Sequence, residues 1–262
     1  MGMIDQRKQV VRTAVSLLEA GLVSGTAGNV SVREVGTQCF LITPSAVNYR
    51  VMGEQDIVQV ELSSGYARGQ RRPSSERELH RQIYKMREDV NAVIHHHSPY
   101  ATAVAVARKT IPNILDEGID LTPIPTVGYC LAGSPELGRE VAAKLAEGRN
   151  AVLLANHGAV VVGENLKEAL NRSVEVERLA QVFVWAEALG GAVPLEEGAV
   201  ERSKDFLKQY RNTIAEGATL QTSQSAEDSE SLSLADLVRF SFRSWVTFGS
   251  LIHNLVLQRL RR

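Results

Sequence analysis

The chain has 262 residues, of which 44% are hydrophobic and 23% charged, a composition typical of a soluble globular protein with room for one full domain and an appendage. The formal net charge of −1 argues against a nucleic-acid binder driven by bulk electrostatics. Two isolated cysteines provide no disulfide framework, and the lack of a signal peptide or a bilayer-length apolar run indicates a cytoplasmic location.

The first predicted elements are a helix, a glycine-rich turn and a short strand. Residues 4–20 carry apolar side chains at helical spacing, and an alternating strand follows at 30–32. Between them lies SGTAGN (24–29), whose glycines allow successive N–H groups to converge on an anion, with Thr26 and Asn29 as added donors. Taken alone, this stretch is more typical of a plain turn.

A helix is predicted over residues 74–88. Ser75 and Glu78 fit a capping box, which gives Glu78 a structural role. Glu76, in the first turn, has no such role, and its ordinary explanation is a favourable charge on the helix dipole. Exposed N–H groups beside Ser74 and Ser75 also attract phosphate. Before this helix the pattern indicates strands at 39–43 and 56–62 and a polar, arginine-rich connection at 65–73.

The stretch VIHHHS (93–98) begins as a β-prone, apolar strand. Strand alternation sends His95 and His97 to one face and His96 to the other. Two imidazoles on rigid backbone form half of a site for zinc or a similar divalent ion. A satisfied histidine pair at a strand end explains the motif as well until further ligands are found.

The second half of the chain contains a candidate for the third ligand. A buried strand at 151–155 runs into Asn156, His157 and Gly158, so a histidine stands at a strand end beside a glycine that permits close approach. The other predicted elements are helices at 100–107, 134–147, 166–189 and 194–210, an irregular acidic segment at 111–121, and a strand at 159–162. Ser134 is expected as the N-cap of its helix.

The last part of the chain has a different composition. Residues 219–231 are polar and read as a linker, and a basic amphipathic helix is expected from Ser233 onward. We therefore divide the chain into a main domain at 1–217 and a tail at 218–262. The tail helix fits an oligomer contact, and a peripheral membrane or partner contact is the alternative.

Taken together, these motifs resemble the class II (metal-dependent) aldolase and adducin-head family. The similarity covers residues 4–212 in the family's order and spacing. The matching segments are SGTAGNVSVR (24–33), LITPSAV (41–47), PSSERELH (73–80), VIHHHSPYATAVAV (93–106) and LLANHGAVVVG (153–163). The resemblance implies an α/β fold of three layers, α/β/α, with a central, mostly antiparallel sheet. It also implies a homotetramer with active sites between neighbouring subunits.

The resemblance further implies the site residues. His95, His97 and His157 would bind the metal, zinc in the best-known members, and Glu76 would be the catalytic acid/base and a fourth ligand when substrate is absent. The substrate phosphate would be held by Thr26, Gly28, Asn29, Thr43, Ser45, Ser74 and Ser75. The implied reaction is reversible cleavage of a ketose 1-phosphate, such as fuculose 1-phosphate, to dihydroxyacetone phosphate and a small aldehyde through a metal-stabilised enediolate.

One departure from the family pattern concerns the leaving group. Related aldolases carry a tyrosine soon after the Ile-Pro that follows the histidine strand, and here Ile-Pro (111–112) leads to no tyrosine. Asp116, Glu117 or a neighbour's Tyr210 are the candidates to replace it. The acidic segment is also similar to that of phosphopentulose 4-epimerases, so an epimerase, dehydratase or decarboxylase remains an alternative. A non-catalytic adducin-like scaffold is disfavoured, because a scaffold has no physical need for all four metal-site residues.

Overall fold

The computed structural model describes residues 3–221. The chain divides into two compact units, Met1–Leu207 and Lys208–Arg262. The basic helix expected from Ser233 lies outside the described residues. Among the residues that are described, no helix is both long and apolar enough to cross a membrane.

An eight-stranded sheet forms the centre of the first unit. Its order is β4-β3-β2-β1-β5-β8-β7-β6, and every neighbouring pair is antiparallel except β6 with β7. The strands are β1 (Asn29–Arg33), β2 (Cys39–Ile42), β3 (Val58–Glu61), β4 (Ala67–Arg68), β5 (Ala92–His96), β6 (Thr126–Val127), β7 (Ala151–Leu154) and β8 (Gly158–Gly163).

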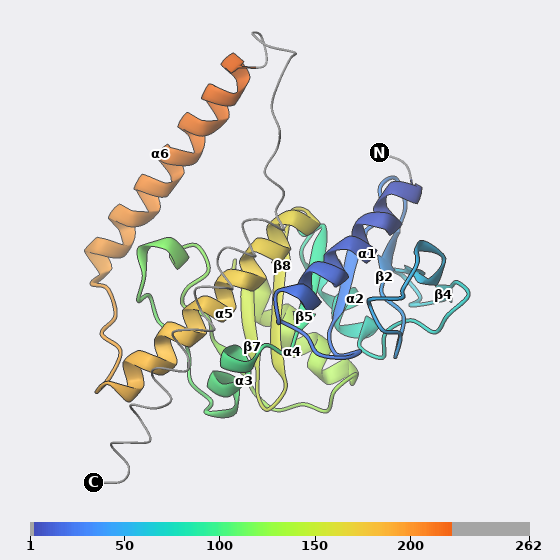
Figure 1. Cartoon of the computed structure of the whole chain (residues 1–262), viewed down its shortest axis with the longest axis horizontal. Coiled ribbons are helices and arrows are strands. Elements are labelled where there is room, and N and C mark those ends of the chain that lie inside the picture. Colours follow the sequence, from blue (N-terminus) through green and yellow to red (C-terminus); the bar gives the residue numbers. More distant parts are fainter. Residues whose placement is uncertain (1–2, 222–262) are drawn as a thin grey trace. The chain divides into compact units, whose positions relative to one another are not determined.

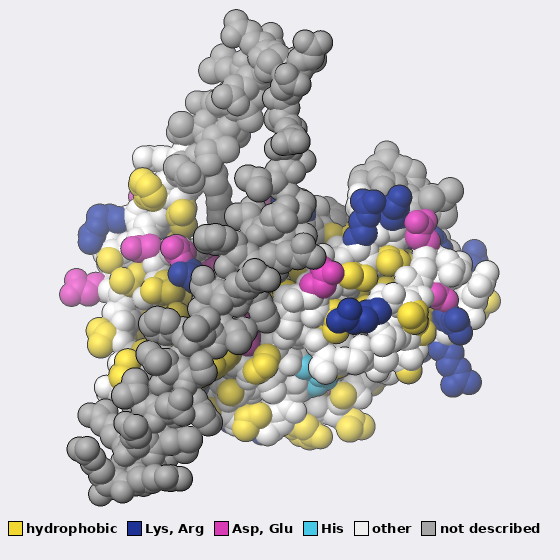
Figure 2. All heavy atoms as spheres, viewed as in Figure 1, with side chains coloured by type: hydrophobic (Ala, Val, Ile, Leu, Met, Phe, Trp, Pro, Cys, Tyr) yellow, Lys and Arg dark blue, Asp and Glu magenta, His cyan; other side chains and the backbone are white. Residues whose placement is uncertain are grey.

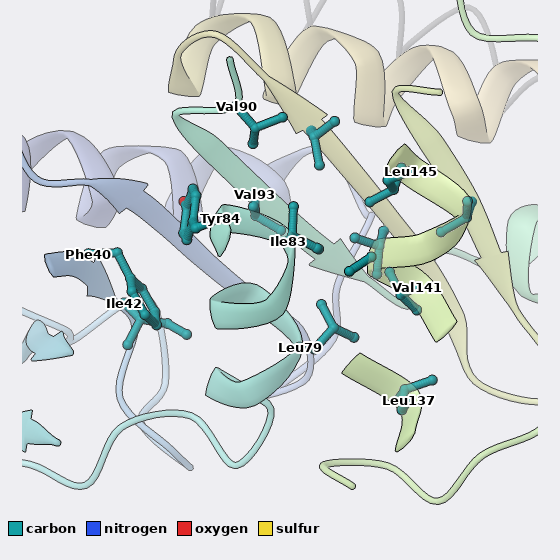
Figure 3. Packing of buried hydrophobic residues seen from close by; sticks show 14 of the residues in the cluster. Phe40, Ile42, Leu79, Ile83, Tyr84, Val90, Val93, Leu137, Val141 and Leu145 are labelled. Atoms are coloured by element: carbon teal, nitrogen blue, oxygen red, sulfur yellow. The ribbon is translucent and has the colours of Figure 1, made fainter. Parts of the chain in front are cut away.

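Helices cover both faces of this sheet. The α-helices are α1 (Met3–Glu19), α2 (Arg77–Met86), α3 (Pro99–Val106), α4 (Pro135–Ala146), α5 (Leu166–Ala188) and α6 (Glu197–Gln221), and two short 3-10 turns are η1 (Glu54–Asp56) and η2 (Asp116–Gly118). Helices α2 and α4 pack together on one face (Figure 3), and α1, α3 and α5 lie on the other (Figure 1). The expected three-layer α/β/α fold is confirmed.

The alternation of strand β5 decides which side chains reach which helical layer. Val93 packs with Leu79 and Ile83 of α2, whereas Ile94 packs with residues of α1. Because successive residues of a strand point to opposite faces, His95 shares the α2 face with Val93. The sheet thereby aims this histidine at the start of α2.

Two local predictions were wrong. The polar connection at 65–73 contains β4, a two-residue edge strand that pairs with β3. The capping box at the start of α2 does not form, and Glu76 occupies the N-cap position without a side-chain cap. Glu78 instead accepts two hydrogen bonds from Arg81, both at 2.8 Å, because a guanidinium three residues away is a stronger partner than a backbone N–H. By contrast, Ser134 does cap α4, accepting a hydrogen bond from the N–H of Leu137.

Candidate metal centre

The fold brings four side chains from three separate segments to one place. Glu76 stands at the N-cap of α2, His95 lies in β5, and His97 immediately follows that strand. His157 occupies the turn of the β7–β8 hairpin. Because β8 pairs with both β5 and β7, this turn lies beside the end of β5. The ligand set inferred from the sequence is thus assembled by strand pairing.

The ligand atoms of these four residues all lie within 4.8 Å of one another. The Nε2 atoms of His95 and His97 are 2.8 Å apart, and His95 Nε2 is 3.1 Å from Glu76 Oε2. His157 Nε2 is 3.4 Å from Glu76 Oε1. Glu76 and His95 are buried, whereas His97 and His157 are half-buried, so the cluster is open on the side of the latter two. A small patch of histidine surface is visible in Figure 2.

A hydrogen bond behind the cluster fixes the form of one imidazole. His95 Nδ1 is 2.9 Å from the carbonyl oxygen of Ala159 in β8. A carbonyl oxygen only accepts, so Nδ1 carries the hydrogen and the lone pair of Nε2 faces the other ligands. This backbone contact is the usual outer partner of a metal-ligating histidine.

The protonation states also suit a cation. Burial would raise the pKa of Glu76, but the neighbouring His95, by charge and hydrogen bond, together with His157 and Asn29, holds that pKa well below its usual range. Burial and then the charge of His95 lower the pKa of His97 to about 4, and the same two causes lower the pKa of His157. At neutral pH the half-buried His97 and His157 are therefore neutral imidazoles, and Glu76 is a carboxylate.

This donor set fits a divalent metal ion. Three imidazole nitrogens and one carboxylate oxygen are the ligands of zinc and similar ions. Glu76 Oε1 is buried and has no hydrogen-bond partner within the described part of the chain. An acceptor oxygen buried without a donor is costly unless a cation satisfies it.

The glycines next to the cluster are required by close backbone approach. A Cβ on Gly158 would collide with the carbonyl oxygen of His96 and lie 2.9 Å from His97 Cδ2. Gly28 has a φ of +76°, and a Cβ there would lie 2.7 Å from the carbonyl oxygen of His95. The expectation that a glycine beside His157 permits close approach is confirmed, and the approaching group is the backbone of β5.

Hydrogen bonds connect the three segments expected to hold phosphate, at 24–29, 43–45 and 72–75. The N–H of Ser74 donates to the carbonyl oxygen of Thr43 at 3.1 Å, and the N–H of Ser45 donates to that of Arg72 at 2.9 Å. The hydroxyl of Tyr49 donates to the carbonyl oxygen of Gly28 at 2.7 Å. Burial raises the pKa of Tyr49 to about 12, so this phenol stays a donor. The sequence had not singled out Tyr49.

The side chains of these segments fall into two groups. Thr26, Ser45 and Ser75 are exposed. Thr43 and Ser74 are buried, and their hydroxyls accept hydrogen bonds from the backbone N–H groups of β1 and of Glu76, each at 3.2 Å. The exposed hydroxyls are those free to meet a ligand, while the buried pair shapes the loops.

Asn29 is directly joined to the metal-site carboxylate. Its Nδ2 donates to Glu76 Oε2 at 2.9 Å, and its Oδ1 is engaged by His80. An amide nitrogen carries two hydrogens, so Asn29 can hold Glu76 with one and offer the second to substrate.

The two acidic candidates to replace the missing tyrosine make contacts of their own. Asp116 is exposed in η2 and accepts a hydrogen bond from Ser203, while Glu117 forms an ion pair with Arg178. Tyr210 lies in α6, and its side chain falls outside the described part of the chain. Neither Asp116 nor Glu117 is among the four clustered ligands.

Comparison with known proteins finds class II aldolases by family model, by sequence and by structure. The model of the class II aldolase and adducin N-terminal domain matches residues 8–184. The L-fuculose phosphate aldolase of Escherichia coli K12 is 37% identical over 214 residues, covering 80% of this chain and 97% of that protein. A 5-methylthioribulose-1-phosphate/5-deoxyribulose-1-phosphate aldolase of Rhodospirillum rubrum is also 37% identical, over 80% of this chain and 90% of its own length. A solved structure of L-fuculose 1-phosphate aldolase superposes with a TM-score of 0.75 at 34% identity, over 79% of this chain and 98% of that one.

Proposed function

Because this chain belongs to the class II aldolase and adducin N-terminal domain family, we propose that it is a metal-dependent aldolase acting on a ketose 1-phosphate. The reaction is reversible cleavage to dihydroxyacetone phosphate and a small aldehyde. The observation that carries this proposal is the convergence of Glu76, His95, His97 and His157 beside the tied loops at 24–29, 43–45 and 72–75.

The four clustered residues would hold one divalent ion per subunit, for which we propose zinc. A bound divalent ion supplies Lewis-acid stabilisation of the negative charge that develops on the ketose oxygens as the carbon–carbon bond breaks. The Ala159 carbonyl keeps the His95 imidazole in the ligating tautomer. The half-buried His97 and His157 border the open side, where substrate enters.

Glu76 is the proposed acid/base. Its lowered pKa keeps it as a carboxylate, the form needed to accept a proton from C3 of dihydroxyacetone phosphate in the condensation direction. In the cleavage direction the same group returns the proton to C3. A positioned acid/base of this kind contributes ~10²–10⁴-fold to the rate.

The loops around the cluster are proposed to bind the phosphate. The residues assigned to this role are Thr26, Gly28, Asn29, Thr43, Ser45, Ser74 and Ser75. Exposed hydroxyls on Thr26, Ser45 and Ser75 and the N–H groups beside them would donate to the phosphate oxygens. Binding the phosphate remotely from the reacting carbons supplies energy for positioning the substrate.

The remaining assignments concern assembly. We propose a cytoplasmic homotetramer with active sites between subunits, a catalytic domain at 1–217, and a tail at 218–262 that contacts other subunits. Asp116 or Glu117, or a neighbouring subunit's Tyr210, would take the proton from the C4 hydroxyl during cleavage and return it to the aldehyde oxygen during condensation. Each of these side chains carries a group that can transfer a proton.

A cleavage screen tests the proposal. Fuculose 1-phosphate, 5-deoxyribulose 1-phosphate and 5-methylthioribulose 1-phosphate are incubated with the protein, and dihydroxyacetone phosphate is measured with and without a chelator. We expect release of dihydroxyacetone phosphate that the chelator abolishes and added zinc restores. Conversion without dihydroxyacetone phosphate would contradict the aldolase and favour an epimerase or dehydratase. No conversion of any ketose phosphate would favour a scaffold.

A further inference from the structure

A buried chain of hydrogen bonds extends from the metal-site carboxylate into the layer between β1 and α2. Glu76 Oε2 accepts from Asn29, and Asn29 Oδ1 is bonded to His80 Nε2. His80 Nδ1 is 2.6 Å from Ser31 Oγ, which in turn is 2.8 Å from the hydroxyl of Tyr84. Asn29, Ser31, His80 and Tyr84 are all at most 3% exposed.

The periodicity of the two elements explains this arrangement. Glu76, His80 and Tyr84 recur every four residues and so lie along one face of α2. Asn29 and Ser31 alternate on one face of β1, the face opposite to the one through which Val30 packs on α1. Two regular elements thus place five polar groups in one line.

Only one assignment of hydrogen atoms satisfies every residue in this series of hydrogen bonds. Asn29 Nδ2 is a donor, so the other end of the amide, Oδ1, must accept, and His80 Nε2 must carry a hydrogen. Burial, followed by the charge of His95, lowers the pKa of His80 to about 3, so the ring is neutral and has a single N–H. His80 Nδ1 is then an acceptor for the Ser31 hydroxyl, and Ser31 accepts from Tyr84.

This order determines which end of the Asn29 amide faces Glu76. If His80 presented its other tautomer, its bare Nε2 would face Asn29 Oδ1, and the two acceptors would repel. The amide would then be driven to turn its oxygen toward the carboxylate. Ser31 and Tyr84 prevent this by occupying His80 Nδ1 with a donor.

From this geometry we propose that His80 is a positioning residue for the proposed aldol reaction, acting through Asn29 to hold Oε2 of Glu76. Glu76 Oε2 is anchored by Asn29 at 2.9 Å and lies 3.1 Å from His95 Nε2. Glu76 Oε1 has no hydrogen-bond partner among the described residues. The anchored oxygen fixes the plane of the carboxylate. Oε1, which a bound cation would satisfy while substrate is absent, is then the oxygen left to meet the reacting carbon. This inference rests on the proposed function.

Three variants separate positioning from mere core filling. His80→Leu fills a similar volume and removes the N–H, while His80→Gln supplies an amide N–H that can still reach Asn29. Ser31→Ala removes the donor that sets the tautomer. Ser173→Ala is the matched control, because Ser173 is also fully buried and its hydroxyl donates only to a helix carbonyl, that of Ala169.

We expect His80→Leu to lower kcat by ~10–100-fold, the range for outer partners of ligating groups, with KM little changed and full metal content. His80→Gln restores most of kcat, Ser31→Ala shows an intermediate loss, and Ser173→Ala keeps the wild-type kcat. If His80→Leu fails to fold, the comparison of His80→Gln, Ser31→Ala and Ser173→Ala decides. A kcat within about twofold of wild type in His80→Leu, or equal losses in Ser31→Ala and Ser173→Ala, would overturn the proposal.

A second measurement does not depend on activity. Nitrogen-15 NMR of metal-free wild-type protein should show the signals of a neutral imidazole protonated at Nε2 that vanish in His80→Gln. An Nδ1-protonated or charged His80 at neutral pH would overturn the hydrogen-bond order. If the wild-type enzyme cleaves no ketose phosphate, the proposed function fails. Absence of the Nε2-protonated His80 signal from a wild-type enzyme that is active refutes this inference alone.

Discussion

Gly158→Ala is the substitution that most directly couples the fold to the metal site. Gly158 begins β8 immediately after His157 and packs against the end of β5. An added Cβ would collide with the carbonyl oxygen of His96 and lie 2.9 Å from Cδ2 of His97. The first of these neighbours is backbone, so it cannot rotate away, and the two strands must separate or the His97 ring must move.

Gly158→Ala is expected to lower both the stability of the protein and its affinity for metal. Overpacking a close-packed contact destabilises a protein by ~1–3 kcal/mol, and the upper end applies here because the colliding atom belongs to a strand paired on both sides. Displacement of His97 and of the adjacent His157 also alters two ligand positions. We expect a loss in metal affinity on the order of 10–100-fold, as for other changes that disturb ligand orientation.

Urea denaturation of the metal-free protein and a chelator competition for zinc measure these two effects. Gly128→Ala is the matched control, because a Cβ there meets nothing within 4 Å and the backbone is not left-handed. It should change the free energy of unfolding by less than about 0.5 kcal/mol. Equal stability and equal zinc affinity in the two variants would refute the idea that β5 and β8 position the ligands through this contact.

Three further perturbations test other parts of the account. Glu76→Gln should lower kcat by ~10²–10⁴-fold and His95→Ala by more, and steady-state kinetics showing the smaller loss for His95→Ala would reverse this order. The pKa values of His80 and His96 are each lowered to about 3, first by burial and second by the charge of His95. Below about pH 6.5 these two histidines therefore become protonated in the unfolded chain but stay neutral in the folded chain. The free energy of unfolding of the metal-free protein should therefore fall as pH decreases from about 6.5, by up to ~1.4 kcal/mol per pH unit for each histidine, and a value independent of pH in urea titrations would contradict this. Glu177 accepts three hydrogen bonds at the start of α3, at 2.6–2.9 Å. Glu177→Ala should therefore lower the free energy of unfolding by ~1–3 kcal/mol in urea titrations. An unchanged midpoint would show that these hydrogen bonds add no stability.

The strand carrying the histidines shows what a sequence reveals well. A period of two places His95 and His97 on one face whatever the surroundings, and the structure confirms this for His95, which faces α2 with Val93. His157 could be inferred because a buried apolar run ending in a histidine and a glycine is a local pattern. The layers follow from the same periodicity, since alternate residues of β5, β7 and β8 pack toward α2 and α4 on one face and toward α1, α3 and α5 on the other.

The features that the sequence did not reveal depend on contacts between distant segments. His80 looks like any polar residue on a helix, and its partners Asn29 and Ser31 are 51 and 49 residues away. Only the packing of α2 on β1 makes them neighbours. The four-residue spacing of Glu76, His80 and Tyr84 was the available signal. The capping box failed for a related reason, because Glu78 found a stronger partner in Arg81.

Metal content measured together with ligand type tests the central claim most directly. The protein is purified without added metal, loaded with zinc, freed of excess ion, and analysed by mass spectrometry for metal and by X-ray absorption for coordinating atoms. The account predicts about one ion per chain bound by nitrogen and oxygen donors of the cluster Glu76, His95, His97 and His157, and no tightly bound ion in His95→Ala. Less than one ion per several chains, or equal content in wild type and His95→Ala, would contradict it.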